Sequence, residues 1–94
     1  MITKFENFIF EKINYMEVYL NKDKSKNIYK DTKSYTVFKG NEMYFAECKG
    51  IEIINWKYLG KVNRSIYSVN GKLISGKENI ALFINFQKIL EPIK

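Results

Sequence analysis

Few residues of this sequence are of the types that carry out catalysis. The chain has no histidine and a single cysteine, Cys48. The usual general base and the commonest metal ligand are therefore missing, and a Cys48 nucleophile would need a lysine to activate it. One cysteine also cannot build a structural zinc site within one chain. We expect Cys48 to be a small buried side chain, and we predict no catalytic residue, metal site or cofactor.

Two carboxylates stand near a predicted turn. Glu47 and Glu52 flank Lys49-Gly50 and would face each other across a hairpin. Such a pair can hold a magnesium ion together with waters, or act as acid and base. Two solvated carboxylates beside a turn are the simpler interpretation, and we favour it.

The segment Gly71–Lys77, GKLISGK, fits part of a phosphate-binding loop. The next residue is Glu78, where the motif needs the hydroxyl of Ser or Thr to bind magnesium. A carboxylate at that position would also repel phosphate. We therefore interpret the segment as a hairpin followed by a turn.

Basic and aromatic residues alternate between positions 56 and 72. Aromatic rings interleaved with cations on a sheet face can stack bases and neutralise phosphates, and Trp, Tyr and Arg also dominate protein–protein hot spots. We predict a binding surface here, supported by lysines of a preceding polar loop, and we expect Arg64 and Tyr67 to contribute most. The predicted binding residues are Lys57, Tyr58, Lys61, Arg64, Tyr67, Lys72, Lys24 and Lys26.

The first element that must support this surface is a predicted helix at 4–20. Thr3 and Glu6 form a capping-box pattern, in which each side chain satisfies a backbone N–H of the other residue. Apolar residues follow at spacings of three and four, which places them on one helical face. They are Ile2, Phe5, Ile9, Ile13, Met16 and Leu20.

Beyond a polar loop at 21–33, the pattern becomes that of β-strands. Glycines arrive about every ten residues, and the runs between them are rich in β-branched and aromatic residues. Asn70-Gly71 is the strongest hairpin signal, and Gly40-Asn41 and Lys49-Gly50 are further turns. The strand at 42–48 is apolar on both faces and should be central. We predict strands at 34–39, 42–48, 51–58, 62–69 and 72–75.

The C-terminal segment 77–90 fits two structures. Ile80, Leu82, Ile84 and Phe86 alternate as in a strand, whereas Ser75 and Glu78 form a second capping-box pattern ahead of an apolar helical face. We favour the helix. The predicted fold is therefore a single α+β domain, 1–94, with an N-terminal amphipathic helix packed on an antiparallel meander sheet of about five strands.

Composition narrows the function only partly. The net charge is +6, but an abundance of Lys, Ile and Asn is typical of an AT-rich genome, and Arg64 is the only arginine. The lone cysteine and the lack of a long apolar run predict a cytoplasmic protein with no membrane partner. We predict a small non-enzymatic interaction protein of a phage or mobile element, which binds a host protein or ribonucleoprotein complex, such as a defence nuclease, and inhibits or modulates it. The alternative is a protein that binds RNA or single-stranded DNA.

Overall fold

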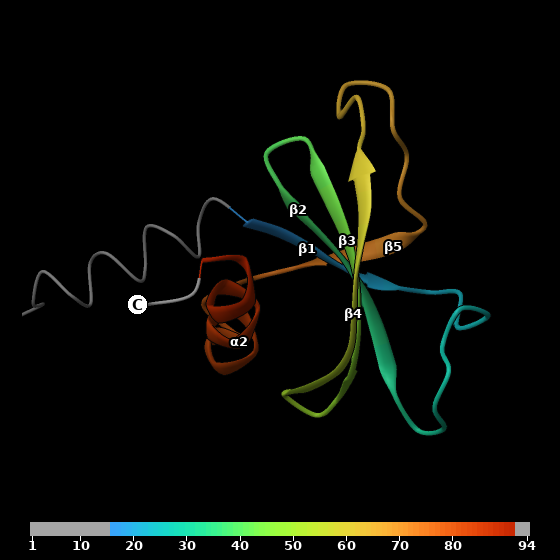
Figure 1. The fold of residues 1–94 in the computed structure, drawn as a ribbon, viewed down its shortest axis with the longest axis vertical. Coiled ribbons are helices and arrows are strands. Elements are labelled where there is room, and N and C mark those ends of the chain that lie inside the picture. Colours follow the sequence, from blue (N-terminus) through green and yellow to red (C-terminus); the bar gives the residue numbers. More distant parts are fainter. Residues whose placement is uncertain (1–15, 92–94) are drawn as a thin grey trace, which may run out of the picture.

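The computed structural model describes residues 16–91, which form one antiparallel β-sheet with a helix packed on one of its faces (Figure 1). The five strands lie in the order β4-β3-β2-β1-β5. The strands are β1 Met16–Asn21, β2 Lys33–Lys39, β3 Glu42–Lys49, β4 Glu52–Lys61 and β5 Gly71–Ile74, and the helix is α2, Ile80–Leu90. Within the described residues, no helix is long and apolar enough to cross a membrane.

The strands β2, β3 and β4 form consecutive hairpins close to the predicted positions. They correspond to the predicted strands 34–39, 42–48 and 51–58, with small differences at the ends. Gly40 and Gly50 lie in the two turns with φ of 61° and 62°, a region that glycine adopts without strain. As its apolar pattern predicts, β3 is an interior strand and is largely buried on both faces.

The predicted fold with an N-terminal helix at 4–20 is wrong. Residues 16–21 form the strand β1, which pairs with both β2 and β5, and residues 4–15 of the prediction lie outside the described residues. Met16 and Leu20 are four positions apart, a spacing that places two side chains on one face of a helix and also on one face of a strand. Val18 lies between them and, like Met16, is buried. The buried side chains therefore repeat every two residues, as they do in a strand.

The connection from β4 to β5 differs from the predicted strand at 62–69 and from the predicted hairpin at Asn70-Gly71. Residues 62–70, which we call the crossover, contain no strand and carry the chain to the opposite edge of the sheet, where β5 pairs with β1. Asn63 explains the missing strand: its side-chain oxygen accepts hydrogen bonds from the Ser65 amide at 3.1 Å and the Ser65 hydroxyl at 2.6 Å. Such side-chain turns compete with strand pairing.

Gly71 is needed for close backbone packing rather than for a turn. A Cβ atom at this position would lie 2.7 Å from the backbone oxygen of Leu20. We therefore expect Gly71→Ala to push β5 away from β1 and to lower the free energy of unfolding by about 1–3 kcal/mol. Thermal melts followed by circular dichroism test this, with Lys72→Ala as the control on the same strand. Equal melting temperatures for the two variants would contradict the close approach.

The helix α2 covers one face of the sheet, which we call the helix face. This confirms the helix predicted at 77–90 against the alternative strand, although it begins at Ile80. The Phe86 side chain is fully buried, and its ring centroid lies 5.8 Å from those of both Tyr35 and Trp56. The rest of the buried cluster consists of Met16, Val18, Val37, Ala46, Cys48, Leu82 and Phe83.

Candidate binding site on the open face of the sheet

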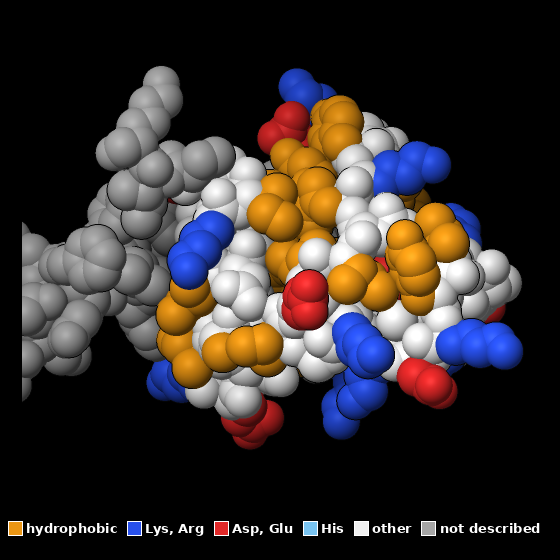
Figure 2. Space-filling view, turned by 60° about the horizontal axis from the view of Figure 1, so that its bottom comes forward, with side chains coloured by type: hydrophobic (Ala, Val, Ile, Leu, Met, Phe, Trp, Pro, Cys, Tyr) orange, Lys and Arg blue, Asp and Glu red, His pale blue; other side chains and the backbone are white. Residues whose placement is uncertain are grey.

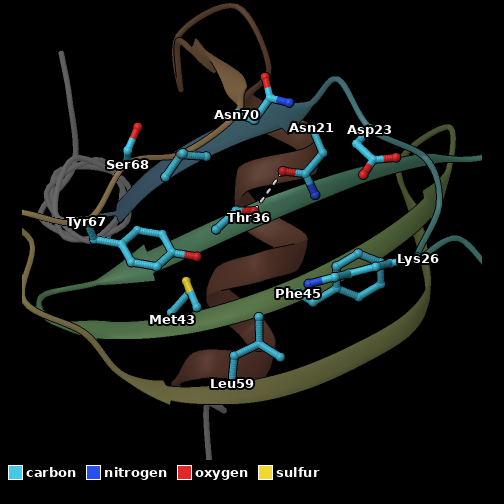
Figure 3. A pocket seen from close by; sticks show the side chains of 11 residues that line it. Asn21, Asp23, Lys26, Thr36, Met43, Phe45, Leu59, Tyr67, Ser68 and Asn70 are labelled. Atoms are coloured by element: carbon cyan, nitrogen blue, oxygen red, sulfur yellow. Dashed lines mark hydrogen bonds between the residues drawn. The ribbon is translucent and has the colours of Figure 1, made fainter.

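The opposite face of the sheet, which we call the open face, carries no helix among the described residues. Side chains alternate between the two faces of a strand, so Phe38, Met43 and Phe45 point away from α2. All three are nevertheless buried. Two irregular segments lie against them: the loop 22–32, which we call the anchor loop, and the crossover 62–70 (Figure 3).

Glu47 holds the anchor loop in place. This carboxylate is fully buried and accepts hydrogen bonds from the backbone amides of Ile28 at 2.9 Å and Tyr29 at 2.8 Å, and from the Thr32 hydroxyl at 2.7 Å. Burial by itself raises the pKa of Glu47, but these hydrogen bonds outweigh it and hold the pKa below its usual value. Glu47 is therefore an ionised structural anchor.

The pairing of Glu47 with Glu52, which we considered for magnesium or acid–base chemistry, does not form. Glu47 is opposite Asn55 across the hairpin, whereas Glu52 is opposite Lys49. No group of three or more potential metal ligands occurs within residues 16–91. Cys48 is buried, as expected, and burial raises its pKa to about 12, so its thiol stays protonated at neutral pH.

Arg64 ties the crossover to the sheet. Its guanidinium donates two hydrogen bonds to the Glu17 carboxylate, at 3.3 and 3.1 Å, and its central carbon lies 3.6 Å from the centre of the Phe38 ring. The hydrogen bonds from Arg64 lower the pKa of Glu17. The Tyr67 ring packs edge-on against Phe38 with a centroid distance of 6.1 Å. Arg64 thus makes its main contacts inside the chain.

A cleft of about 160 Å³ lies between the anchor loop and the crossover. Its floor is the sheet itself, with Met43 and Phe45 from β3 and Leu59 from β4. Figure 3 shows Tyr67 reaching in from the crossover, and Lys26 lines the cleft from the anchor loop. The cleft is therefore apolar at its base and has an aromatic and a cationic side chain at its walls.

The structure distributes the eight predicted binding residues over both faces. Lys26 and Tyr67 line the cleft, Lys24 lies in the anchor loop, and Lys57 is opposite Phe45 on the open face. The other three strand residues belong to the helix face, because directly opposite residues of paired strands share a face and their partners lie on that face. The pairs are Tyr58 with Tyr44, Lys61 with Glu42 and Lys72 with Leu20. Arg64 lies beside the cleft but is engaged with Glu17 and Phe38.

Sequence reasoning identified Lys26 and Tyr67 but none of the other polar residues of the cleft. Asn21 and Thr36 face the same side of neighbouring strands, and the Thr36 hydroxyl donates a 2.7 Å hydrogen bond to the Asn21 side-chain oxygen (Figure 3). Ser68 and Asn70 come from the crossover. Thr36, which stands between Tyr35 and Val37 in β2, is a signal in the sequence that could have indicated this site.

No family model matches the chain, and no curated protein and no solved structure matches it significantly. Function is therefore inferred from the residues of the chain itself.

Proposed function

We propose that this is a non-enzymatic binding protein and that a protein partner docks on its open face. The observation that carries the proposal is the exposure of large apolar side chains on both segments beside the cleft. Ile28 and Tyr29 of the anchor loop are 71% and 54% exposed, and Ile66 and Tyr67 of the crossover are 80% and 43% exposed. Tyr67 also lines the cleft, and large exposed apolar side chains on the segments that border a cleft are typical of interaction sites.

The charge of the same surface favours an acidic partner. The anchor loop carries four lysines and two aspartates, and Lys57 adds a further cation on the open face. Figure 2 shows one end of the molecule, where basic side chains, with some acidic ones among them, stand around patches of hydrophobic surface. Apolar contacts would supply most of the affinity, while the lysines would speed association and orient the partner.

Binding of RNA or single-stranded DNA is the alternative, and we place it second. The chain's only arginine, Arg64, is engaged with Glu17 and Phe38. Arginine is the side chain best suited to bidentate phosphate contacts. The exposed isoleucines Ile28 and Ile66 offer neither an aromatic platform for base stacking nor a charge for phosphate.

The biological setting of the partner belongs to the same proposal. We propose a cytoplasmic protein of a phage or mobile element that inhibits or modulates a host complex, such as a defence nuclease. Small size, a composition typical of AT-rich genomes and the lack of histidine support this setting. The protonated, buried thiol of Cys48 supports binding rather than catalysis.

The test is a pull-down from native host lysate with and without nuclease. We expect the wild type to retain a protein after nuclease treatment and at moderate salt. The double variant Ile28→Ser and Ile66→Ser should lose it. The control is Ile51→Ser with Ile89→Ser, because these isoleucines are 55% and 40% exposed on the β3–β4 turn and on α2. Loss of the captured protein on nuclease treatment, or equal capture by both double variants, would contradict the proposal.

A further inference from the structure

We infer that the cleft holds one tyrosine or tryptophan side chain from an extended acidic segment of the partner. This inference rests on the proposed function and specifies what enters its central site. The cleft measures about 160 Å³, whereas pockets for drug-sized ligands usually measure roughly 300–1,000 Å³. A cleft of this size suits a single side chain.

The floor of the cleft is suited to an aromatic ring. Phe45 belongs to the floor and Tyr67 to a wall, so an inserted ring can contact both aromatic side chains (Figure 3). The thioether of Met43 lies between them in the same view, and methionine sulfur makes favourable contacts with aromatic rings. Both Met43 and Phe45 are already more than nine-tenths buried, so the floor is preorganised.

The polar groups of the cleft favour a ring with a polar tip. On the sheet side, Asn21 and Thr36 are hydrogen-bonded to each other, and the Asn21 amide also donates to the Ser34 hydroxyl at 3.3 Å. On the crossover side, the side chains of Ser68 and Asn70 have no hydrogen-bond partner within residues 16–91 and line the cleft. They can bond the hydroxyl of a tyrosine or the N–H of a tryptophan.

Charge distinguishes the inside of the cleft from its surroundings. Lys26 and Asp23 both line it, so their charges offset each other there. Hydrogen bonds from the Ser25 amide at 2.8 Å and hydroxyl at 2.9 Å lower the pKa of Asp23 and keep it ionised. A neutral side chain therefore suits the interior better than a phosphate or carboxylate. Outside the cleft, Lys24 of the anchor loop and Lys57 of β4 favour acidic residues next to the inserted ring.

The experiment is an NMR titration of the ¹⁵N-labelled full chain with synthetic probes. The first probe is the blocked peptide Ac-Asp-Glu-Trp-Glu-Asp-NH₂; in the second, alanine replaces Trp, and in the third, lysines replace the acidic residues. A thymidine oligonucleotide is the fourth. We expect saturable shifts at Phe45, Leu59 and residues 66–70 with the first probe. The second and third should bind at least tenfold more weakly, and the oligonucleotide should cause no saturable shift in the cleft.

Two variants test whether the peptide occupies the cleft itself. Tyr67→Ala removes one aromatic wall, and Ser68→Leu fills the cleft from the crossover; each should weaken the tryptophan peptide at least tenfold. The control is Tyr58→Ala, since Tyr58 is 51% exposed on the helix face. The same spectra show whether each variant is folded. If Tyr67→Ala is unfolded, Ser68→Leu alone tests whether the peptide occupies the cleft.

The inference is overturned if the alanine peptide binds as well as the tryptophan peptide, if no peptide gives saturable shifts, or if only the oligonucleotide binds the cleft. None of these outcomes contradicts the proposed function, because the pull-down tests it independently. If the peptides fail while the Ile28 and Ile66 double variant still loses its partner in the pull-down, the docking surface stands without the inserted aromatic ring.

Discussion

Replacing Phe86 by alanine should lower the melting temperature by roughly 15–30 °C, the largest single stability effect we expect. Phe86 is fully buried between the sheet and α2, and its ring contacts the rings of Tyr35, Trp56 and Phe83. Removing such a side chain costs about 3–5 kcal/mol through lost contacts and the remaining cavity. A domain of this size has only about 5–15 kcal/mol of stability in total. Thermal melts followed by circular dichroism measure the change.

The matched control is Ile89→Ala on the same helix. Ile89 is 40% exposed, so its loss should change stability by less than about 1 kcal/mol. Trp56, the only tryptophan, provides a second readout, because its ring stacks on Tyr44 at 5.1 Å and lies against Phe86. Its fluorescence should shift towards that of exposed tryptophan in Phe86→Ala at temperatures where the wild type is folded. Similar melting temperatures for the two variants would refute the packing of α2 on the sheet.

The parts of the fold that depend on neighbouring residues were predictable from the sequence. The two central hairpins follow from glycine turns and from runs of β-branched and aromatic residues, and each paired strand is the next one along the chain. The C-terminal helix was recognised although its apolar residues also alternate like those of a strand. Its apolar residues at 82, 83 and 86 lie on one helical face and are all buried.

The errors arise where pairing depends on residues far apart in the sequence. β5 pairs with β1, about fifty positions earlier in the chain. The turn signal at Asn70-Gly71 predicts pairing with the preceding segment and does not indicate β1. The same kind of separation hides the partner of Arg64. Glu17, 47 positions earlier, accepts its hydrogen bonds in the fold, whereas the predicted binding role of Arg64 stays a prediction. The cleft was missed for the same reason, because its walls are brought together only by the crossover and the anchor loop.

Glu47→Ala should release the anchor loop while leaving the sheet folded. The carboxylate is the shared acceptor for the amides of Ile28 and Tyr29 and for the Thr32 hydroxyl. Without it, these donors lose a charge-assisted acceptor, and hydrogen exchange of the two amides should become roughly 10- to 100-fold faster. Glu52→Ala is the control, since Glu52 is exposed and opposite Lys49. Unchanged exchange at Ile28 and Tyr29 would mean that the loop is held by other contacts.

The same anchor should make the protein sensitive to acid. Folding lowers the pKa of Glu47 below the ordinary value of 4.5, so the stabilisation is complete well above pH 4.5 and is lost as the pH falls through the lower pKa of the folded state. Glu47→Gln keeps the shape of the side chain but removes the charge. The difference in melting temperature between the wild type and Glu47→Gln should therefore stay constant from pH 8 to about pH 5.5 and shrink below pH 4.5. A difference that stays constant down to pH 2 would show that the hydrogen-bonding geometry of Glu47, and not its charge, holds the anchor loop at the edge of the cleft.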